Sequence, residues 1–447
     1  MLYRVIRAIV RVALGLFYRL QVERRAAELE GPVVLVGNHP NSLIDPALVF
    51  VVTNRHVTFL AREPLFRAPV LGWILKGIGA LPVYRKQDHP GLMQKNEGTL
   101  DAAAQALKEQ RCITIFPEGK SHSEAQLSEI KTGCARIALK AVRGGAPPRI
   151  VPIGLTYEEK NRFRSKVRIE VGEPIPSPPA PAEGEEAERE WVKSFTETIE
   201  TALRRVTLNL DEWADLPVIQ TAEQLYALKI GEKDRDPERL RRFARGLEMM
   251  RAERPEEFVD LRDQVLEFRR RLDLISADPK DLALQYRRPE VARFVLRNGV
   301  ALVFGLPLFL IGCVLFGIPF LMVRYAARFS GLAKDRIATM KLIGALVMTP
   351  IWQVLLAWLA WRAWGTPGLV TALVCTFPLA LYTRYFLERR RASIRDAFTF
   401  LQLSNRIRLK ATLLVEGERL AGEIERIALE LRPRVFEELP PSQPQTS

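Results

Sequence analysis

Three uncharged, apolar stretches late in the sequence strongly restrict what this chain can fold into. They are residues 298–323, 342–361 and 363–383. A helix needs about 20 consecutive apolar residues to cross the hydrocarbon core of a bilayer, and each stretch reaches that length. We therefore expect membrane segments within residues 298–390 and an integral membrane protein.

Basic residues flank these stretches unevenly. Clusters of arginine and lysine precede the first stretch, separate it from the second and follow the third, whereas only Arg362 lies between the second and third. Basic residues favour the cytoplasmic side, and three simple crossings cannot place every cluster there. A re-entrant first stretch can, and it contains helix-interrupting residues: Gly305, Pro307, Gly312, Gly317 and Pro319. We predict this broken, re-entrant helix followed by a hairpin, with three full crossings as the alternative.

Residues 1–25 combine arginines at helical spacing with large apolar residues. The arginines interrupt any long apolar core, which argues against a secretory signal peptide. We predict an amphipathic helix in the membrane interface; the alternative is a soluble helix that packs on the next domain. Because much of the +14 net charge flanks apolar segments, we expect an anionic membrane surface as the partner and no nucleic acid.

Short β-rich runs alternate with helical patterns between residues 31 and 172. The runs are 33–36, 57–60, 112–116, 150–155 and 167–171. This alternation predicts an α/β domain over residues 26–212, with a mostly parallel sheet flanked by helices. A Pro- and Glu-rich connection at 173–190 and a closing helix at 191–210 complete the domain.

Residues 213–297 are dense in charge and helical in period. Asp236 followed by Pro237 is a typical helix start, and four apolar residues recur on one face of the next helix: Leu261, Val265, Phe268 and Leu272. We expect a helical insert that packs on the α/β domain. For residues 391–447 we predict an amphipathic helix through Leu431 and then a disordered tail.

The cysteines show no paired metal-binding spacing. We expect ordinary reduced residues at Cys112, Cys134, Cys313 and Cys375, in keeping with a cytoplasmic-facing protein. A zinc site is not expected.

His39 is the strongest candidate for a catalytic base. It follows the apolar run 33–38 and is one of four histidines, and the free pKa of histidine lies near cellular pH. A base removes the proton from an attacking hydroxyl, and a carboxylate on the other ring nitrogen fixes its tautomer. Asp45 can supply that carboxylate. Because Pro46 follows, Asp45 is alternatively an ordinary helix cap.

Three further short blocks follow in order, at residues 79–85, 116–119 and 150–153. Arg85 closes the first of them, and its guanidinium fork suits a phosphate; the alternative is a surface arginine. In the second block, Gly119 permits a close ligand approach. Glu118 can bond a substrate hydroxyl or hold Arg85.

The four blocks together resemble the glycerophospholipid acyltransferase family, of the glycerol-3-phosphate and lysophosphatidic acid acyltransferase type. The resemblance covers about residues 31–175. Five residues separate His39 from Asp45, where the family usually has four. Gly119 is followed by Lys120-Ser121-His122, where the family usually has a small residue and then arginine. These departures, with Asn41 two positions after the histidine, resemble the fungal-type glycerol-3-phosphate/dihydroxyacetone-phosphate acyltransferase branch.

The resemblance implies transfer of an acyl chain from acyl-CoA or acyl-carrier protein to glycerol-3-phosphate or dihydroxyacetone phosphate, in phospholipid biosynthesis at the cytoplasmic face. It implies His39 as base, Asp45 as its orienting partner, and no metal or cofactor beyond the acyl-donor co-substrate. The implied substrate-binding residues are Asn41, Arg85, Glu118, Gly119, Lys120 and His122. The alternatives are a lysophosphatidic acid or other lysophospholipid acceptor, an acyl-thioester hydrolase, and a non-catalytic membrane scaffold.

Overall fold

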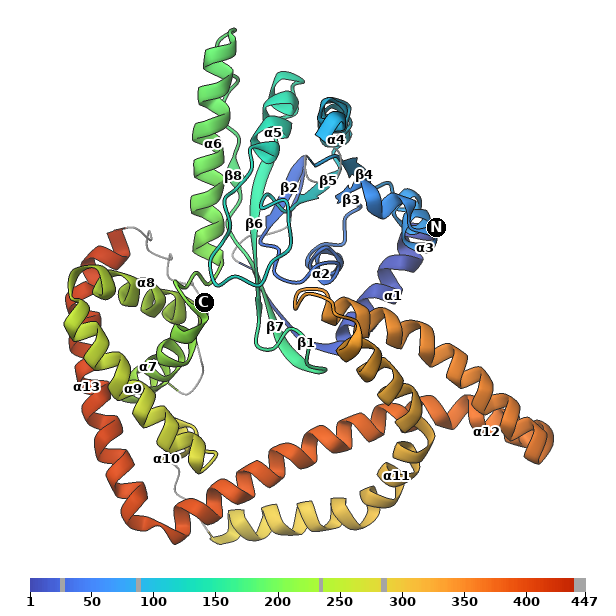
Figure 1. The fold of residues 1–447 in the computed structure, drawn as a ribbon, viewed down its shortest axis with the longest axis vertical. Helices are drawn as coiled ribbons and strands as arrows, with labels where there is room; N and C mark the ends of the chain where they lie inside the picture. Colours follow the sequence, from blue (N-terminus) through green and yellow to red (C-terminus); the bar gives the residue numbers. More distant parts are fainter. Residues whose placement is uncertain (25–28, 86–89, 233–235, 283–287, 438–447) are drawn as a thin grey trace. The chain divides into compact units, whose positions relative to one another are not determined.

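The computed structural model divides the chain into two compact units. The first consists of residues 1–209 with 331–342, and the second of residues 210–330 with 343–447 (Figure 1). The structure describes residues 1–24, 29–85, 90–232, 236–282 and 288–437.

The first unit contains an eight-stranded sheet in the order β1-β7-β6-β2-β5-β3-β4, with β8 paired to β6. The strands are β1 Tyr18–Arg24, β2 Val33–Gly37, β3 Val57–Arg62, β4 Leu81–Val83, β5 Cys112–Ile115, β6 Arg149–Tyr157, β7 Ser165–Val171 and β8 Ile175–Pro176. Strands β6, β2, β5, β3 and β4 run parallel, whereas β7 and β8 run antiparallel to β6. The predicted fold class, a mostly parallel α/β sheet, is confirmed.

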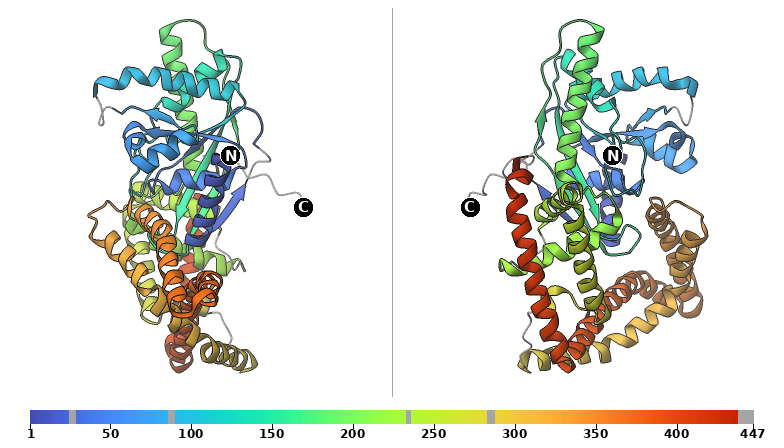
Figure 2. Two further views of the ribbon diagram at one scale, coloured as in Figure 1. Left: turned by 90° about the vertical axis from the view of Figure 1, so that its right-hand side faces the viewer. Right: turned by 60° about the vertical axis from the view of Figure 1, so that its left-hand side comes forward.

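Helices cover both faces of this sheet (Figure 2). They are α1 Leu2–Phe17, α2 Ile44–Val52, α3 Pro69–Gly77, α4 Asn96–Lys108, α5 Gly133–Arg143 and α6 Glu185–Val206. Because side chains alternate along a strand, Val33 and Leu35 pack with α1, α2 and α3, and Val34 and Val36 pack with α4, α5 and α6.

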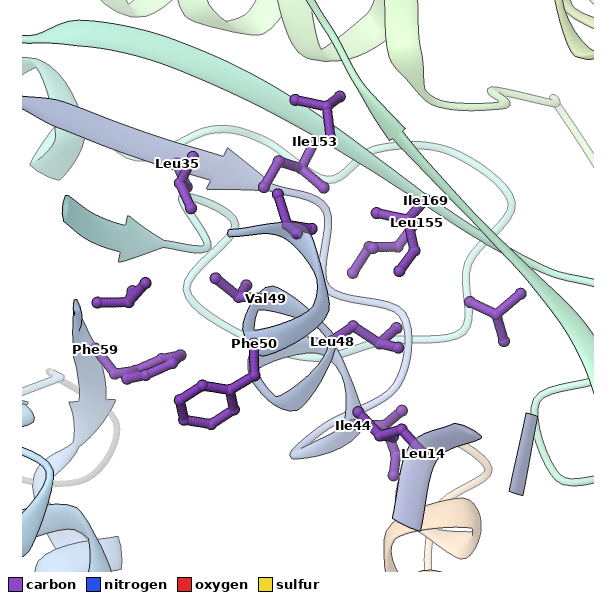
Figure 3. Close-up of a cluster of buried hydrophobic side chains, with 14 of the residues drawn as sticks. Leu14, Leu35, Ile44, Leu48, Val49, Phe50, Phe59, Ile153, Leu155 and Ile169 are labelled. Carbon is purple, nitrogen blue, oxygen red and sulfur yellow. The ribbon is translucent and has the colours of Figure 1, made fainter. Parts of the chain in front are cut away.

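Helix α2 lies deep in one of these cores. Figure 3 shows Leu48 and Val49 of α2 among side chains from α1 and the sheet, including Leu14 and Ile153. Removing apolar surface from water stabilises this packing by about 25 cal/mol per Å². The packing also fixes the position of Asp45, which lies in the first turn of α2.

The N-terminal helix is shorter than predicted. It ends at Phe17, and Tyr18–Arg24 form β1, an edge strand parallel to β7. Tyr18 is buried, and Leu20 and Val22 are partly buried beside exposed neighbours, the two-residue period of a strand. The helical arginine spacing concealed this shorter pattern. One face of α1 packs on the domain, and Arg11 donates to the Phe50 carbonyl.

The second unit contains a helical core of its own. It is built from α7 Leu216–Lys229, α8 Pro237–Glu253, α9 Pro255–Leu274, α10 Pro279–Leu282 and α13 Ile407–Glu437. The Asp236 side chain caps α8 by accepting from Glu238 N at 2.9 Å. Phe268 of the predicted insert packs in one cluster with Leu413 and Leu420 of α13. The predicted tail beyond residue 437 lies outside the described residues.

Two described helices of this unit, α11 Arg288–Phe329 and α12 Ile337–Asn405, are long and apolar enough to cross a membrane. Their most apolar windows are only 11% and 6% buried, unlike the core helix of a soluble protein. Both therefore indicate membrane association.

The two apolar helices differ in continuity. Gly365, at φ +63° and ψ −150°, interrupts α12. The Gln353 amide donates to the Ala372 carbonyl at 3.1 Å, so the two parts of α12 pack against each other as a hairpin. By contrast, α11 keeps Pro307 and Pro319 inside one helix, which changes direction without the predicted break (Figure 1).

Replacing Gly154 with alanine tests the packing of β6 against α6. An added Cβ would lie 1.8 Å from the Val206 carbonyl oxygen, so backbone must move. We expect Gly154→Ala to lower the free energy of unfolding by about 1–3 kcal/mol, measured by thermal unfolding of the full chain. The control is Gly98→Ala in α4, where a Cβ meets nothing within 4 Å; it should be neutral or stabilising. Equal unfolding midpoints for both variants would contradict this packing.

Candidate active site

The site lies where three neighbouring parallel strands end. His39 follows β2, Phe116 follows β5, and Tyr157 ends β6. Carboxyl ends of parallel strands share one edge of a sheet, a common place for ligand sites. Asn38 fixes the His39 loop to β6: its amide nitrogen donates to Leu155 O at 3.1 Å, and its amide oxygen accepts from Leu155 N at 2.8 Å.

His39 and Asp45 form a direct pair. The Nδ1 atom of His39 lies 2.8 Å from Asp45 Oδ2, and the Asp45 side chain is fully buried whereas that of His39 is 19% exposed. An ionised carboxylate only accepts hydrogen bonds, so Nδ1 carries the proton and Nε2 keeps its lone pair. Within the described part of the chain Nε2 has no hydrogen-bond partner, and Phe116 stacks on the ring at 4.5 Å. His39 is therefore arranged to act as a base.

The Asp45 carboxylate accepts two further hydrogen bonds. Asn41 N donates to Oδ2 and the Tyr157 hydroxyl donates to Oδ1, each at 2.5 Å. Burial and the Asp45 charge hold the pKa of Tyr157 well above its usual value of 10.0, so its hydroxyl stays a protonated donor. Asp45 does not cap α2, whose N-cap residue is Leu43. In the loop between His39 and Asp45, Ser42 adopts φ +42°.

Glu118 and His122 brace the His39 loop. Glu118 is 3% exposed; its Oε1 accepts from His39 N at 2.7 Å, and its Oε2 accepts from Ser128 N at 2.8 Å. His122 Nε2 pairs with Oε2, and His122 N donates to His39 O at 3.1 Å. Both oxygens of the Glu118 carboxylate thus accept hydrogen bonds from protein groups. Contact of Glu118 or His122 with the acceptor stays a prediction.

Two basic residues lie at one exposed turn. Arg85 donates to the Gly119 carbonyl at 2.8 Å, and Lys120 is the next residue, exposed to solvent. Gly119 has φ +69°, a conformation that favours glycine. The sequence-predicted Arg85, Gly119 and Lys120 are therefore brought together, in an arrangement that suits an anionic ligand.

Asn41 lies in the protein interior next to Asp45. It is fully buried, and its amide nitrogen donates to the Tyr18 hydroxyl at 3.2 Å. Tyr18 in turn donates to the Lys160 carbonyl at 2.6 Å. Burial raises the pKa of Tyr18, so this hydroxyl also stays protonated. Substrate contact by Asn41 remains a prediction.

Sequence reasoning missed several residues of this network. Tyr157 could have been found, because it lies two residues beyond the predicted run 150–155, at the end of β6. Tyr18 could not, because the arginine spacing of residues 1–25 predicts a helix at that position. Among the described residues, no group of three or more His, Cys, Asp or Glu is arranged to hold a metal ion.

One family model matches within the first unit. Residues 19–156 match the family model described as Acyltransferase. Glycerol-3-phosphate O-acyltransferase 2 of Saccharomyces cerevisiae is 32% identical, over 57% of this chain and 37% of its own. Glycerol-3-phosphate O-acyltransferase 1 of the same yeast is 35% identical, over 32% of this chain and 20% of its own. The human 1-acyl-sn-glycerol-3-phosphate acyltransferase beta is 27% identical, over 36% of this chain and 57% of its own.

The chain thus spans little more than a third of the first yeast relative and a fifth of the second. Among solved structures, the 1-acyl-sn-glycerophosphate (LPA) acyltransferase PlsC of Thermotoga maritima is 22% identical, with a TM-score of 0.32, over 44% of this chain and 78% of that one. The family match and the yeast relatives confirm the resemblance predicted from the four blocks.

Replacing Glu118 with glutamine tests the brace. The amide removes the charge and turns one acceptor into a donor that faces other donors. We expect Glu118→Gln to destabilise the full chain by about 1–3 kcal/mol, measured by chemical unfolding. The control is Glu129→Gln in the same segment. Glu129 is 83% exposed and pairs with Lys131, so loss of this ion pair should not measurably change the free energy of unfolding. Equal effects of the two changes would refute the brace.

Proposed function

We propose that this protein is an O-acyltransferase that moves an acyl chain from acyl-CoA or acyl-carrier protein to a hydroxyl of glycerol-3-phosphate or dihydroxyacetone phosphate, in phospholipid biosynthesis. The observation that carries the proposal is the paired His39 and Asp45 at the sheet edge where Arg85 reaches the Gly119 turn. A base for a hydroxyl and cations for a phosphate are what such an acceptor needs. The names of the two yeast relatives support the same acceptor class.

The reaction needs one proton to move twice. His39 Nε2 takes the proton from the acceptor hydroxyl as its oxygen attacks the thioester carbonyl carbon, and Asp45 stabilises the imidazolium that forms. When the tetrahedral intermediate collapses, the carbon–sulfur bond breaks and the thiolate leaves. His39 returns the proton to the sulfur, which yields the ester and the free thiol. The enzyme supplies no nucleophile of its own.

In the proposed reaction, Arg85 and Lys120 bind the phosphate of the acceptor. Arg85 contributes a guanidinium charge and Lys120 a compact ammonium charge, and Arg85 is held to the Gly119 turn by its 2.8 Å hydrogen bond. Lysophosphatidic acid carries the same phosphate and one free hydroxyl, so it is the second candidate acceptor, in line with the human relative's name. An assembled dyad argues against a scaffold, and nearby cations favour a phosphorylated acceptor over water.

We also propose that both ends of α11 lie on the side of the membrane that carries the active site. Among the described residues before Arg288, no helix is long and apolar enough to cross. The segment after α11, Gly331–Leu342, belongs to the first unit. Thus α11 enters and returns, whereas α12 forms a hairpin with its far end near Gly365. The basic clusters then share the cytoplasmic face.

His39→Ala tests the function. We expect turnover to fall about a hundred- to ten-thousand-fold, because the variant lacks the imidazole that takes the hydroxyl proton in the proposed reaction. Ester formation is measured with purified full-length protein, acyl-CoA and one acceptor at a time: glycerol-3-phosphate, dihydroxyacetone phosphate, lysophosphatidic acid or none.

The control for that test is His56→Ala, since His56 stacks on Tyr3 at 4.0 Å outside the dyad. This variant should keep its turnover. Absence of transfer to every acceptor by the wild type would contradict the proposal, and free acid released without an acceptor would point to a hydrolase.

Single cysteines test the membrane arrangement. In a background with Cys313→Ala and Cys375→Ala, we expect a membrane-impermeant thiol reagent added outside cells to label Thr366→Cys but not Ala333→Cys. Thr366 follows the α12 break, and Ala333 lies in the segment between the apolar helices. Buried Cys112 and Cys134, whose thiol pKa values burial raises to about 12, should stay unlabelled. External labelling of Ala333→Cys would refute the re-entrant helix.

A further inference from the structure

The segment Gly331–Leu342 stands apart from its sequence neighbours. It comprises the connection after α11 and the first residues of α12, yet it belongs to the compact unit that contains the active site, whereas the residues on both sides of it belong to the other unit. The sequence offered no signal for this placement, because the segment carries none of the four acyltransferase blocks. We call residues 331–342 the membrane linker.

The membrane linker is held to the first unit by polar and apolar contacts. The Ser121 hydroxyl donates to Asp335 Oδ2 at 2.5 Å, across 214 residues of sequence. Lys341 Nζ donates to the Asn161 carbonyl at 2.7 Å. Ala338 is fully buried in the core that also holds α1 and α2. These contacts fix the linker at more than one point.

Asp335 contacts the loop that carries the predicted phosphate cation. Ser121 lies between Lys120 and His122, and His122 braces both Glu118 and the His39 backbone. Asp335 is 6% exposed, and burying a carboxylate is costly unless donors satisfy it. A carboxylate in direct contact with a phosphate would repel it. The position of Asp335 therefore suits support of the loop, not contact with the acceptor.

Lys160 extends this support toward the base. Its ammonium donates to Ser123 Oγ at 3.3 Å, in the same loop as Ser121. Burial lowers the pKa of Lys160, and the charges of Asp45 and Asp335 oppose that shift. Asp335 of the membrane linker and Asp45 of the dyad thus both favour the charged form of this partly buried lysine.

We infer that Asp335 is a positioning residue of the acceptor site: through Ser121 it holds the loop 119–123 in the conformation that binds the phosphate of a phosphorylated three-carbon acceptor. The inference rests on the proposed function and deepens it. It makes the membrane linker a part of the acceptor site, so that the chain between the two apolar helices sets acceptor affinity.

The test is a double-mutant cycle on the full-length protein, with acceptor affinity as the readout. We expect Ser121→Ala and Asp335→Ala each to raise the Kd for glycerol-3-phosphate, measured by calorimetry, and its KM by about tenfold, since one charge-assisted hydrogen bond is lost. The acyl-CoA KM should stay unchanged. The double variant should be no worse than either single variant, because both remove the same contact.

Two further variants separate positioning from mere structure. Asp335→Asn keeps an oxygen that accepts from Ser121 and should recover most of the acceptor affinity. Asp101→Asn removes an exposed partner of Lys140 in the first unit and should change neither Kd nor KM. A purely structural role for Asp335 would instead lower the unfolding midpoint and the apparent kcat while leaving KM unchanged.

The outcomes distinguish this inference from the proposed function. Wild-type binding and acylation of glycerol-3-phosphate with unaltered Kd and KM in both alanine variants would overturn the inference alone. Additive effects of the two variants would also overturn it. Failure of the wild type to bind glycerol-3-phosphate would overturn both the inference and the proposed acceptor.

Discussion

The buried charge of Asp45 is the interaction on which the rest of the site depends. A carboxylate with a fully buried side chain is stable only when donors replace the water it has lost. Those donors come from His39, the Asn41 backbone and Tyr157, which lie after β2, before α2 and at the end of β6. The sheet must therefore be correctly paired, and α2 correctly packed, before the base is oriented. Packing and chemistry are coupled at this one side chain.

A second set of contacts fixes the loops around the predicted phosphate-binding residues. Glu118 ties the β5 loop to the His39 backbone, and Arg85 ties the segment after β4 to Gly119. His39 and Arg85 are thus held by loops that share one edge of a parallel sheet. The proposed reaction requires no nucleophile from the protein, because the acceptor supplies the hydroxyl.

The sequence was sufficient for the parts of this account that depend on local pattern. The strands β2, β3, β5, β6 and β7 follow from short β-rich runs, and the ordered blocks led to His39, Asp45 and the glycine turn. The parts it could not predict depend on contacts between distant residues. Tyr18 is placed by pairing with β7, and Asp335 by a hydrogen bond across 214 residues. In residues 1–25, the helical spacing of arginines hid a strand. In α11, glycine and proline predicted a break, but the helix stays continuous.

A structure of the full-length protein with bound glycerol-3-phosphate tests the central claim most directly. The account predicts the phosphate beside Arg85 and Lys120, and a hydroxyl of the acceptor within about 2.6–3.2 Å of His39 Nε2, the distance that proton transfer requires. A phosphate bound away from both cations, or an acceptor hydroxyl out of reach of His39, would contradict it.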